Sequence, residues 1–294
     1  PTLTSRARQP KAIAMRTVWL NGEFVPENEA RVPIFDRALL FGQGVYEVTP
    51  VIEGRFCNWQ HHGARLARSM ATARIADDTD WPAVIAELIA RNGLAEGRVY
   101  LQVTGGAPAD RDFLSPAEPV LATRFAFTQA APVLDTPGSR KGLKIMLHPD
   151  GRWALRSAKT TQLLYAVLAK ETAREQGYND AWLVESGVIT EATSANAHII
   201  DARGVLVSHP VDHGVLPGVT RICTLQIARE MGLEVEERAF TPEELLAARE
   251  AFVSSASALV TPVVSVDGKP IGNGGPGTLT GEIRQRYIAL LKAS

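Results

Sequence analysis

Two hairpin signals near the start of the chain constrain its fold more than any other feature. In "VWLNGEFV" (residues 18–25) two short apolar runs flank Asn21-Gly22, and "VYEVTPVIEGRFCNW" (residues 45–59) repeats the pattern around Glu53-Gly54. Asn-Gly favours the tight turn that joins antiparallel strands, because both of its residues tolerate positive φ. The two patterns therefore predict antiparallel strands in the first part of the chain.

Helical stretches alternate with further strand-like runs. Residues 61–73 and 81–93 are helical in character, and Gly93 can end the second helix in a left-handed conformation. Thr241-Pro242-Glu243-Glu244 is a capping box with proline at the first helical position. This mixture of helices and strands predicts an α+β or mixed α/β fold.

A polar stretch that contains proline and glycine, residues 128–142, is the candidate linker between two domains. We expect an N-terminal extension over residues 1–16, a small N-terminal α/β domain over residues 17–133 and a larger C-terminal α/β domain over residues 134–294.

Composition narrows the class of protein. With 31 basic and 32 acidic side chains the net charge is −1, so we expect no nucleic-acid or anionic-membrane partner. No apolar run reaches the roughly eighteen residues of a membrane span. Cys57 and Cys223 form no CxxC motif, and Pro210 makes a helical His209/His213 metal pair unfavourable. We expect a cytoplasmic protein without a metal site.

Lys159 is the first candidate for chemistry. Only seven of the 31 basic residues are lysine, and this one lies where "RSAKTTQLLYAVLAKE" (residues 156–171) changes from polar to apolar. We expect a helix capped by Thr160 or Thr161, whose positive end would disfavour the ammonium form and leave an amine suited to Schiff-base chemistry. The apolar face of that helix would consist of Leu163, Leu164, Val167 and Leu168. The alternative is a solvated surface lysine.

Glu191 is the second candidate, at a predicted strand end in "GVITEATSANAHI" (residues 187–199). A carboxylate there could keep the nitrogen of a pyridine cofactor protonated, so that the ring can withdraw electrons. The small residues that follow would let the ring approach the backbone. An ordinary loop carboxylate is the alternative.

A phosphate site is predicted where the Gly-rich turn "GVLPGVTR" (residues 214–221) runs into a helix. Free amides of Gly218, Val219 and Thr220 would bind an anion there, without the lysine of a Walker loop. Leu216, in the same turn, is a further cofactor-binding candidate. The backbone amides of Ser255 and Ala256, in "FVSSASALVTP" (residues 252–262), would complete the site. Arg65, on a predicted helix, is either a phosphate partner or a solvated charge.

Six blocks follow one another in the order found in the fold-type IV pyridoxal-phosphate enzymes. They are "FDRALLFGQGVYEV", "ARLARS", "RSAKTTQLLYAVLAKETA", "ITEATSANAHII", "LPGVTR" and "FVSSASALVTPVVSVDGK". Over residues 17–291 the chain resembles this family, and within it the bacterial D-amino acid transaminases. The resemblance implies pyridoxal 5′-phosphate bound between two domains, a homodimer, and transfer of an amino group from a D-amino acid such as D-alanine to a 2-oxo acid such as 2-oxoglutarate.

The resemblance also implies roles for single residues. Lys159 matches the lysine that holds the cofactor as a Schiff base and moves the substrate proton. Glu191 matches the carboxylate that faces the pyridine nitrogen, and Tyr46 matches a tyrosine that faces the substrate and the lysine. The positions that match phosphate-binding residues are Arg65, Val219, Thr220 and Ala256.

One loop departs from the family pattern. Many D-amino acid transaminases bind the substrate carboxylate with an Arg-x-His motif after the "QVT" strand, whereas residues 105–116 read "GGAPADRDFLSP" here, without histidine. Arg111 is the cation in this loop, and we expect it to bind the carboxylate. The alternatives are an (R)-amine or branched-chain amino acid transaminase, an aminodeoxychorismate-type lyase, and a non-catalytic cofactor carrier.

Overall fold

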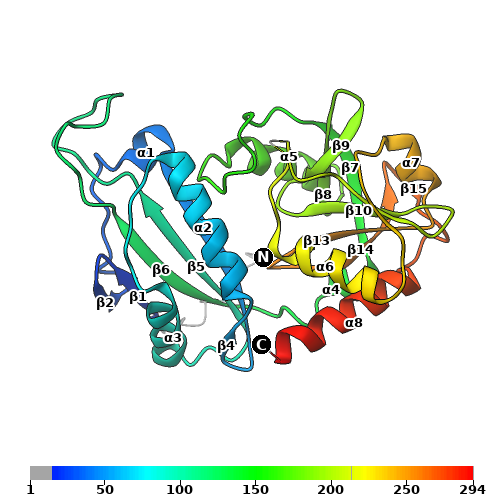
Figure 1. Cartoon of the computed structure of the whole chain (residues 1–294), viewed down its shortest axis with the longest axis horizontal. Helices are drawn as coiled ribbons and strands as arrows, with labels where there is room; N and C mark the ends of the chain where they lie inside the picture. The colour runs from blue at the N-terminus through cyan, green and yellow to red at the C-terminus, as the bar shows by residue number, and fades with distance from the viewer. Residues whose placement is uncertain (1–14, 213, 294) are drawn as a thin grey trace, which may run out of the picture.

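A computed structural model describes residues 15–212 and 214–293, and in it two β-sheets with their helices form two neighbouring lobes (Figure 1). The first sheet has six strands in the order β2-β1-β6-β5-β3-β4, and every neighbouring pair is antiparallel. Its strands are β1 (Thr17–Leu20), β2 (Glu23–Pro26), β3 (Gly44–Ile52), β4 (Arg55–Phe56), β5 (Gly97–Thr104) and β6 (Arg124–Ala130).

Both predicted hairpins are confirmed. Asn21 and Gly22 join β1 to β2 with φ values of 50° and 105°, and Glu53 and Gly54 join β3 to β4 with 53° and 76°. Positive φ at both turn positions matches the right-handed twist of the flanking strands.

Two helices cover one face of the first sheet. They are α2 (Trp59–Ala73) and α3 (Trp81–Asn92), and their buried side chains, such as Leu66 and Leu88, pack with Val99 and Leu101 of β5. Because side chains alternate along a strand, the even-numbered residues of β5 point away from this core. That opposite face includes Arg98 and Tyr100. It faces either the cavity described below or solvent. A short helix, α1 (Arg37–Phe41), precedes β3.

The second sheet has nine strands and mixed polarity. Its order is β12-β11-β10-β13-β14-β7-β8-β9, with β15 paired to β14. The pairs β7–β8, β7–β14 and β11–β12 are parallel. The strands are β7 (Leu143–Pro149), β8 (Asp180–Glu185), β9 (Val188–Ala192), β10 (Asn196–Ile200), β11 (Leu206–Ser208), β12 (Val235–Glu237), β13 (Glu250–Ser255), β14 (Leu259–Val266) and β15 (Lys269–Pro270).

Helices cover both faces of the second sheet. The helix α7 (Pro242–Ala247) begins with the predicted capping box, in which Thr241 and Glu244 exchange hydrogen bonds. The helices α6 (Val219–Glu230) and α8 (Thr278–Ala293) pack on the other face with Phe252. Ile52 and Cys57 of the first lobe belong to that same apolar cluster, which therefore joins the two lobes.

The connection between the sheets differs from the predicted linker. Residues 128–130 belong to β6, and α4 (Pro137–Lys141) is capped by Thr136, whose side chain accepts a hydrogen bond from the amide of Ser139. The unstructured part of the connection is thus shorter than residues 128–142. The mixed α/β class is confirmed, whereas the domain boundary at residue 133 stays a prediction.

The helix expected after Lys159 starts later than predicted. Neither Thr160 nor Thr161 caps it, because α5 (Leu164–Glu175) begins after Leu163. Its buried side chains are alanines, including Ala169 and Ala173, which pack against β8. The predicted apolar face points outwards instead: the exposed fractions are 39% for Leu163, 72% for Leu164, 48% for Val167 and 51% for Leu168.

Three predictions concern either residues outside the described ranges or the absence of a feature. Residues 1–14 of the predicted N-terminal extension, and His213 of the rejected histidine pair, lie outside the described residues. Within residues 15–212 and 214–293 no helix is long and apolar enough to cross a membrane. The same part of the chain contains no cluster of three or more His, Cys, Asp or Glu residues suited to a metal ion.

Candidate active site

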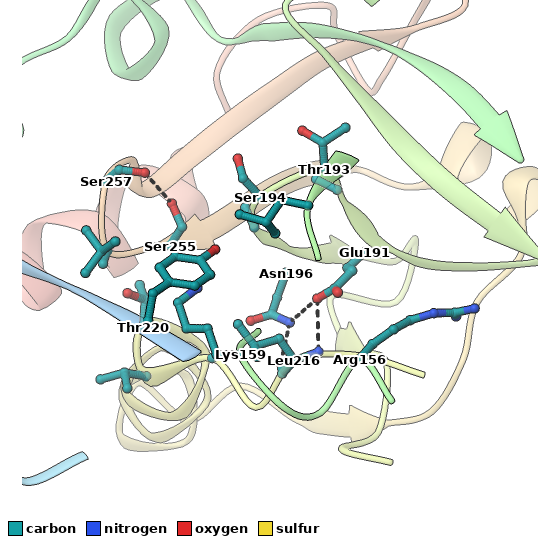
Figure 2. A pocket seen from close by; sticks show the side chains of 18 of the residues that line it. Arg156, Lys159, Glu191, Thr193, Ser194, Asn196, Leu216, Thr220, Ser255 and Ser257 are labelled. Carbon is teal, nitrogen blue, oxygen red and sulfur yellow. Dashed lines mark hydrogen bonds between the residues drawn. The ribbon is translucent and has the colours of Figure 1, made fainter. Parts of the chain in front are cut away.

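A cavity between the two lobes gathers every predicted site residue except Arg111. Its walls include residues of β3, β5 and α2 from the first lobe and of β9, β10, α6 and β13 from the second. The predicted residues that line it are Tyr46, Arg65, Lys159, Glu191, Leu216, Val219, Thr220, Ser255 and Ala256. Figure 2 shows the Lys159 side chain between Thr220 on one side and Glu191 on the other.

The backbone of Lys159 is held by the first lobe. Its carbonyl accepts a 3.0 Å hydrogen bond from the amide of Tyr46, and its amide donates one of 3.0 Å to the Ser69 hydroxyl on α2. Thr160 forms an antiparallel bridge with Val45 of β3. Lys159 therefore lies in a segment that precedes α5 and is bound to β3 and α2, so the predicted position at a helix N-terminus is wrong.

The Lys159 amine instead lies 4.2 Å from the centroid of the Tyr46 ring. Among the described residues no carboxylate forms an ion pair with it. The amine therefore faces the cavity, where it is placed to react with a bound electrophile.

Glu191 is buried at one end of the cavity and accepts hydrogen bonds on both carboxylate oxygens. Asn196 Nδ2 and the amide of Leu216 donate to Oε2 over 3.1 Å and 3.2 Å (Figure 2), and Arg152 donates to Oε1. Burial raises the pKa of Glu191, and the charge and hydrogen bond of Arg152 oppose that shift. These donors favour the ionised carboxylate.

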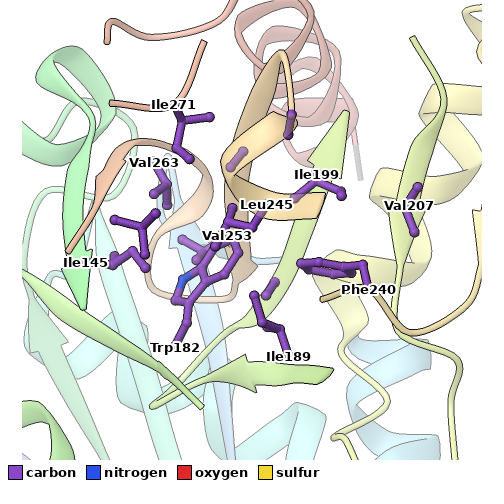
Figure 3. Packing of buried hydrophobic residues seen from close by; sticks show 14 of the residues in the cluster. Ile145, Trp182, Ile189, Ile199, Val207, Phe240, Leu245, Val253, Val263 and Ile271 are labelled. Carbon is purple, nitrogen blue, oxygen red and sulfur yellow. The ribbon is translucent and has the colours of Figure 1, made fainter. Parts of the chain in front are cut away.

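The strand that carries Glu191 is anchored by apolar packing. Ile189, two residues earlier on β9, is fully buried in a cluster with Trp182 and Phe240 (Figure 3). Asp150 also fixes the position of Arg152, because its carboxylate accepts a 2.7 Å hydrogen bond from Arg152 Nη2. The same carboxylate accepts a 2.7 Å hydrogen bond from the Thr190 hydroxyl. Sequence reasoning missed Arg152 and Asn196. The sequence feature that could have indicated Arg152 is the pair of arginines before Lys159 in "GRWALRSAK".

The other end of the cavity is formed by the start of α6 and the turn after β13. Gly218 precedes the helix, and no side chain caps the helix amides. A Cβ atom on Gly218 would lie 2.0 Å from Asn196 Oδ1, so only glycine fits. Ser255, Ala256 and Ser257 line the cavity beside this helix start. Uncapped amides at the positive end of a helix form an anion site.

Arg65 approaches the same end from α2. Its Nη1 donates to the carbonyl of Pro217 at 3.2 Å, while Nε and Nη2 form a bidentate contact of 2.7 Å and 2.8 Å with the buried Glu47. His62 Nδ1 donates to Glu47 at 2.8 Å. Burial alone would raise the pKa of Glu47, but Arg65 and His62 lower it to about 2. A glutamate inside the apolar run "GVYEVTPVI" was the sequence signal for this network.

Arg111 lies away from this cavity within the single chain. It belongs to the exposed loop between β5 and β6, where its guanidinium lies 5.0 Å from the ring centroids of both Phe41 and Phe113. Its expected contact with a substrate carboxylate stays a prediction.

The cavity thus offers an anion site at one end, a carboxylate at the other and an unpaired amine between them. A phosphorylated pyridine aldehyde carries the complementary groups: a phosphate, a basic ring nitrogen and an electrophilic carbon. The residues present fit such a cofactor.

Comparisons with known proteins agree with this chemistry. A family model described as amino-transferase class IV matches residues 44–266. The D-alanine aminotransferase of Bacillus licheniformis is 36% identical over 271 residues, which cover 91% of this chain and 94% of that protein. That of Staphylococcus haemolyticus is 33% identical over 279 residues, with 93% and 97% covered. Among solved structures, the branched-chain amino acid aminotransferase of Escherichia coli has a TM-score of 0.87 at 26% identity, covering 94% of this chain and 95% of that one.

Proposed function

The chain belongs to the class IV aminotransferases, and from this premise we propose that it moves the amino group of a D-amino acid, with D-alanine as the expected donor, to a 2-oxo acid such as 2-oxoglutarate. Its cofactor is pyridoxal 5′-phosphate. The observation that carries the proposal is the arrangement of Lys159 between Glu191 and the uncapped start of α6 in one cavity.

The roles of the cavity residues follow from their chemistry. Val219, Thr220, Ser255 and Ala256 would hold the phosphate through backbone amides, and Arg65 would add a fixed positive charge. Leu216 would lie against the ring, and Glu191 would keep the ring nitrogen protonated. When bound, pyridoxal phosphate supplies an aldehyde for attachment and a ring that withdraws electrons from the substrate.

Lys159 is the base of the proposed reaction. Its amine would take the α-proton of the amino acid and later return it, which is general acid–base catalysis by one group. The Tyr46 ring, 4.2 Å from the amine, would restrict its motion and limit access of water. The adjacent backbone hydrogen bonds to Tyr46 and Ser69 fix the point from which the side chain starts.

The assignment of Lys159 is tested by Lys159→Ala. This variant should fold, lose the visible absorbance of lysine-bound pyridoxal phosphate and lose turnover, because no other lysine lines the cavity among the described residues. Lys170→Ala, which removes a half-exposed lysine on α5, is the matched control and should keep both. Retention of colour and activity by Lys159→Ala would contradict the assignment.

The donor is tested with the holoenzyme and a panel of D-amino acids, branched-chain L-amino acids and (R)-amines. A branched-chain L-donor is the second candidate, because the similar Escherichia coli structure is a branched-chain amino acid aminotransferase. Turnover of D-alanine well above the other donors supports the proposal. Preference for L-leucine or for an (R)-amine would replace it.

We also include a homodimer in the proposal. The outward face of α5 and the residue before it, Leu163, Leu164, Val167 and Leu168, is apolar and exposed, which is unusual for a helix facing water. A second copy of the chain would bury it. Sedimentation equilibrium of the holoenzyme should give twice the chain mass, and Leu164→Glu with Leu168→Glu should shift it to monomer. The expected cytoplasmic location belongs to this proposal too.

A further inference from the structure

Arg98 differs from the other arginines that line the cavity. Arg65 is paired with Glu47, Arg152 with Asp150 and Glu191, and Arg156 with Glu185. Arg98 lines the same cavity, yet within the described ranges no carboxylate pairs with its guanidinium. Its Nε is buried and has no hydrogen-bond partner.

A guanidinium keeps its charge under almost all conditions, so it cannot relieve this situation by losing a proton. Arg98 as a whole is only partly buried, but its Nε is a buried donor without an acceptor, which is costly. The planar donor fork of arginine is complementary to a carboxylate, which it binds through two parallel hydrogen bonds. Arg98 therefore has the properties expected of a residue that binds an anionic ligand.

The register of the first sheet places Arg98 on the face that carries Tyr46. Arg98 on β5 is opposite Pro50 on β3, and Tyr100 is opposite Val48. Side chains directly opposite each other point to the same face, and so do residues two apart along a strand. Tyr46, Val48, Arg98 and Tyr100 thus form one face, and Tyr46, Val48 and Arg98 all line the cavity into which Lys159 extends.

We propose that Arg98 binds the α-carboxylate of the amino acid substrate and so selects amino acids over neutral amines. This inference rests on the proposed function and names the group that recognises its substrate. Arg98 is part of β5, which is hydrogen-bonded to β3 on one side and to β6 on the other, whereas Arg111 belongs to an exposed loop. A carboxylate-binding residue on a strand fixes the substrate more precisely than one on a loop.

The experiment uses the holoenzyme and the variants Arg98→Met, Arg98→Lys and Arg111→Ala. Propionate, which has the carboxylate of D-alanine but no amine, is titrated while the absorbance of the bound cofactor and the inhibition of D-alanine turnover are followed. Arg98→Met should weaken propionate binding and raise KM for D-alanine by about 100- to 1,000-fold, and Arg98→Lys should weaken them less. Cofactor affinity should stay unchanged. Arg91→Met, on the surface of α3, is the control for removing a cation.

Unchanged propionate binding in Arg98→Met would overturn the inference, and a large loss in Arg111→Ala instead would assign the carboxylate to the loop. A neutral (R)-amine should lose little activity in Arg98→Met, and an equal loss for amine and D-alanine would also overturn it. If the unaltered enzyme turns over no amino acid, the proposed function fails, but the propionate titration still tests Arg98. An unchanged melting temperature of Arg98→Met excludes misfolding as the cause of its loss.

Discussion

The Glu191 carboxylate has two oxygens, and the structure supplies donors to each of them separately. Arg152 contacts Oε1, while Asn196 and the Leu216 amide contact Oε2. Burial raises the pKa of Glu191, and the charge and hydrogen bond of Arg152 together with the Leu216 amide oppose that rise. The electrostatic role proposed for Glu191 therefore depends on Arg152, Asn196 and Leu216 as well as on the carboxylate itself.

Glu191→Gln keeps the shape of the side chain and removes its charge. We expect removal of the α-proton to slow by about one to two factors of ten, since a hydrogen bond to a charged group contributes about 1.5–3 kcal/mol. Cofactor affinity should change much less, because the phosphate end is intact. Single-turnover kinetics with D-alanine measure the first effect and equilibrium dialysis the second. Glu175→Gln, on the exposed end of α5, is the control, and an unchanged rate in Glu191→Gln would place the electrostatic partner elsewhere.

At the scale of the element, the start of α6 connects the two ends of the cavity. Gly218 immediately precedes the helix and lies against Asn196, which in turn donates to Glu191 and to the carbonyl of Leu216. The glycine is required here for space rather than for backbone conformation, since its φ is −67°. A side chain at this position would disturb the phosphate end and the carboxylate end together.

Gly218→Ala should therefore weaken cofactor binding and lower stability by about 1–3 kcal/mol, the usual cost of overpacking. Gly281→Ala is the matched control, because Gly281 lies inside α8 with open space around its Cβ position. That substitution should stabilise the protein by about 0.5–1 kcal/mol. Urea unfolding and a cofactor titration of both variants provide the comparison, and equal behaviour of the two glycines would contradict the steric argument.

Elements that depend on local chemistry were predicted well from the sequence. The Asn21-Gly22 turn and the Thr241 capping box each need only neighbouring residues, and both are present. The order of six blocks was sufficient to identify the family. The helix after Lys159 begins later than the sequence predicts, because the backbone of Thr160 and Thr161, the predicted caps, pairs with β3 in the folded chain.

The partners of the site residues could not be predicted in the same way. Asn196 and Arg152 reach Glu191 because β9, β10 and the segment before Lys159 meet in space, and no local pattern encodes that meeting. Arg98 was overlooked because its role depends on strand register across the first sheet. The family resemblance favours Arg111, the cation in the loop where many D-amino acid transaminases carry an Arg-x-His motif, and that role stays a prediction.

On the scale of the whole molecule, Glu47 makes stability depend on pH. Folding lowers the pKa of Glu47 from 4.5 to about 2, so the unfolded chain binds this proton more tightly than the folded chain. The resulting stabilisation is complete above pH 4.5 and is lost as the pH falls towards 2. Its size corresponds to about 3 kcal/mol.

Glu47→Gln should remove this contribution and leave Arg65 without its partner. The difference in unfolding free energy between this variant and the unaltered holoenzyme should be largest near neutral pH, and should shrink by about half at roughly pH 3. Urea unfolding across that range measures it. Glu87→Gln, which breaks an exposed pair with Arg91, should change stability by less than about 1 kcal/mol at every pH. A pH-independent difference for Glu47→Gln would show that the ion pair does not titrate as described.

The backbone hydrogen bonds of Lys159 have a mechanical consequence. Tyr46 and Ser69 bind the Lys159 peptide to the first lobe, whereas Glu191 and the start of α6 belong to the second. If the lobes swung apart as rigid bodies, the reactive amine would travel with one and its electrostatic partner with the other. The distance between the amine and Glu191 therefore depends on how the two lobes are joined, and the apolar cluster that includes Ile52 and Cys57 packs across that junction.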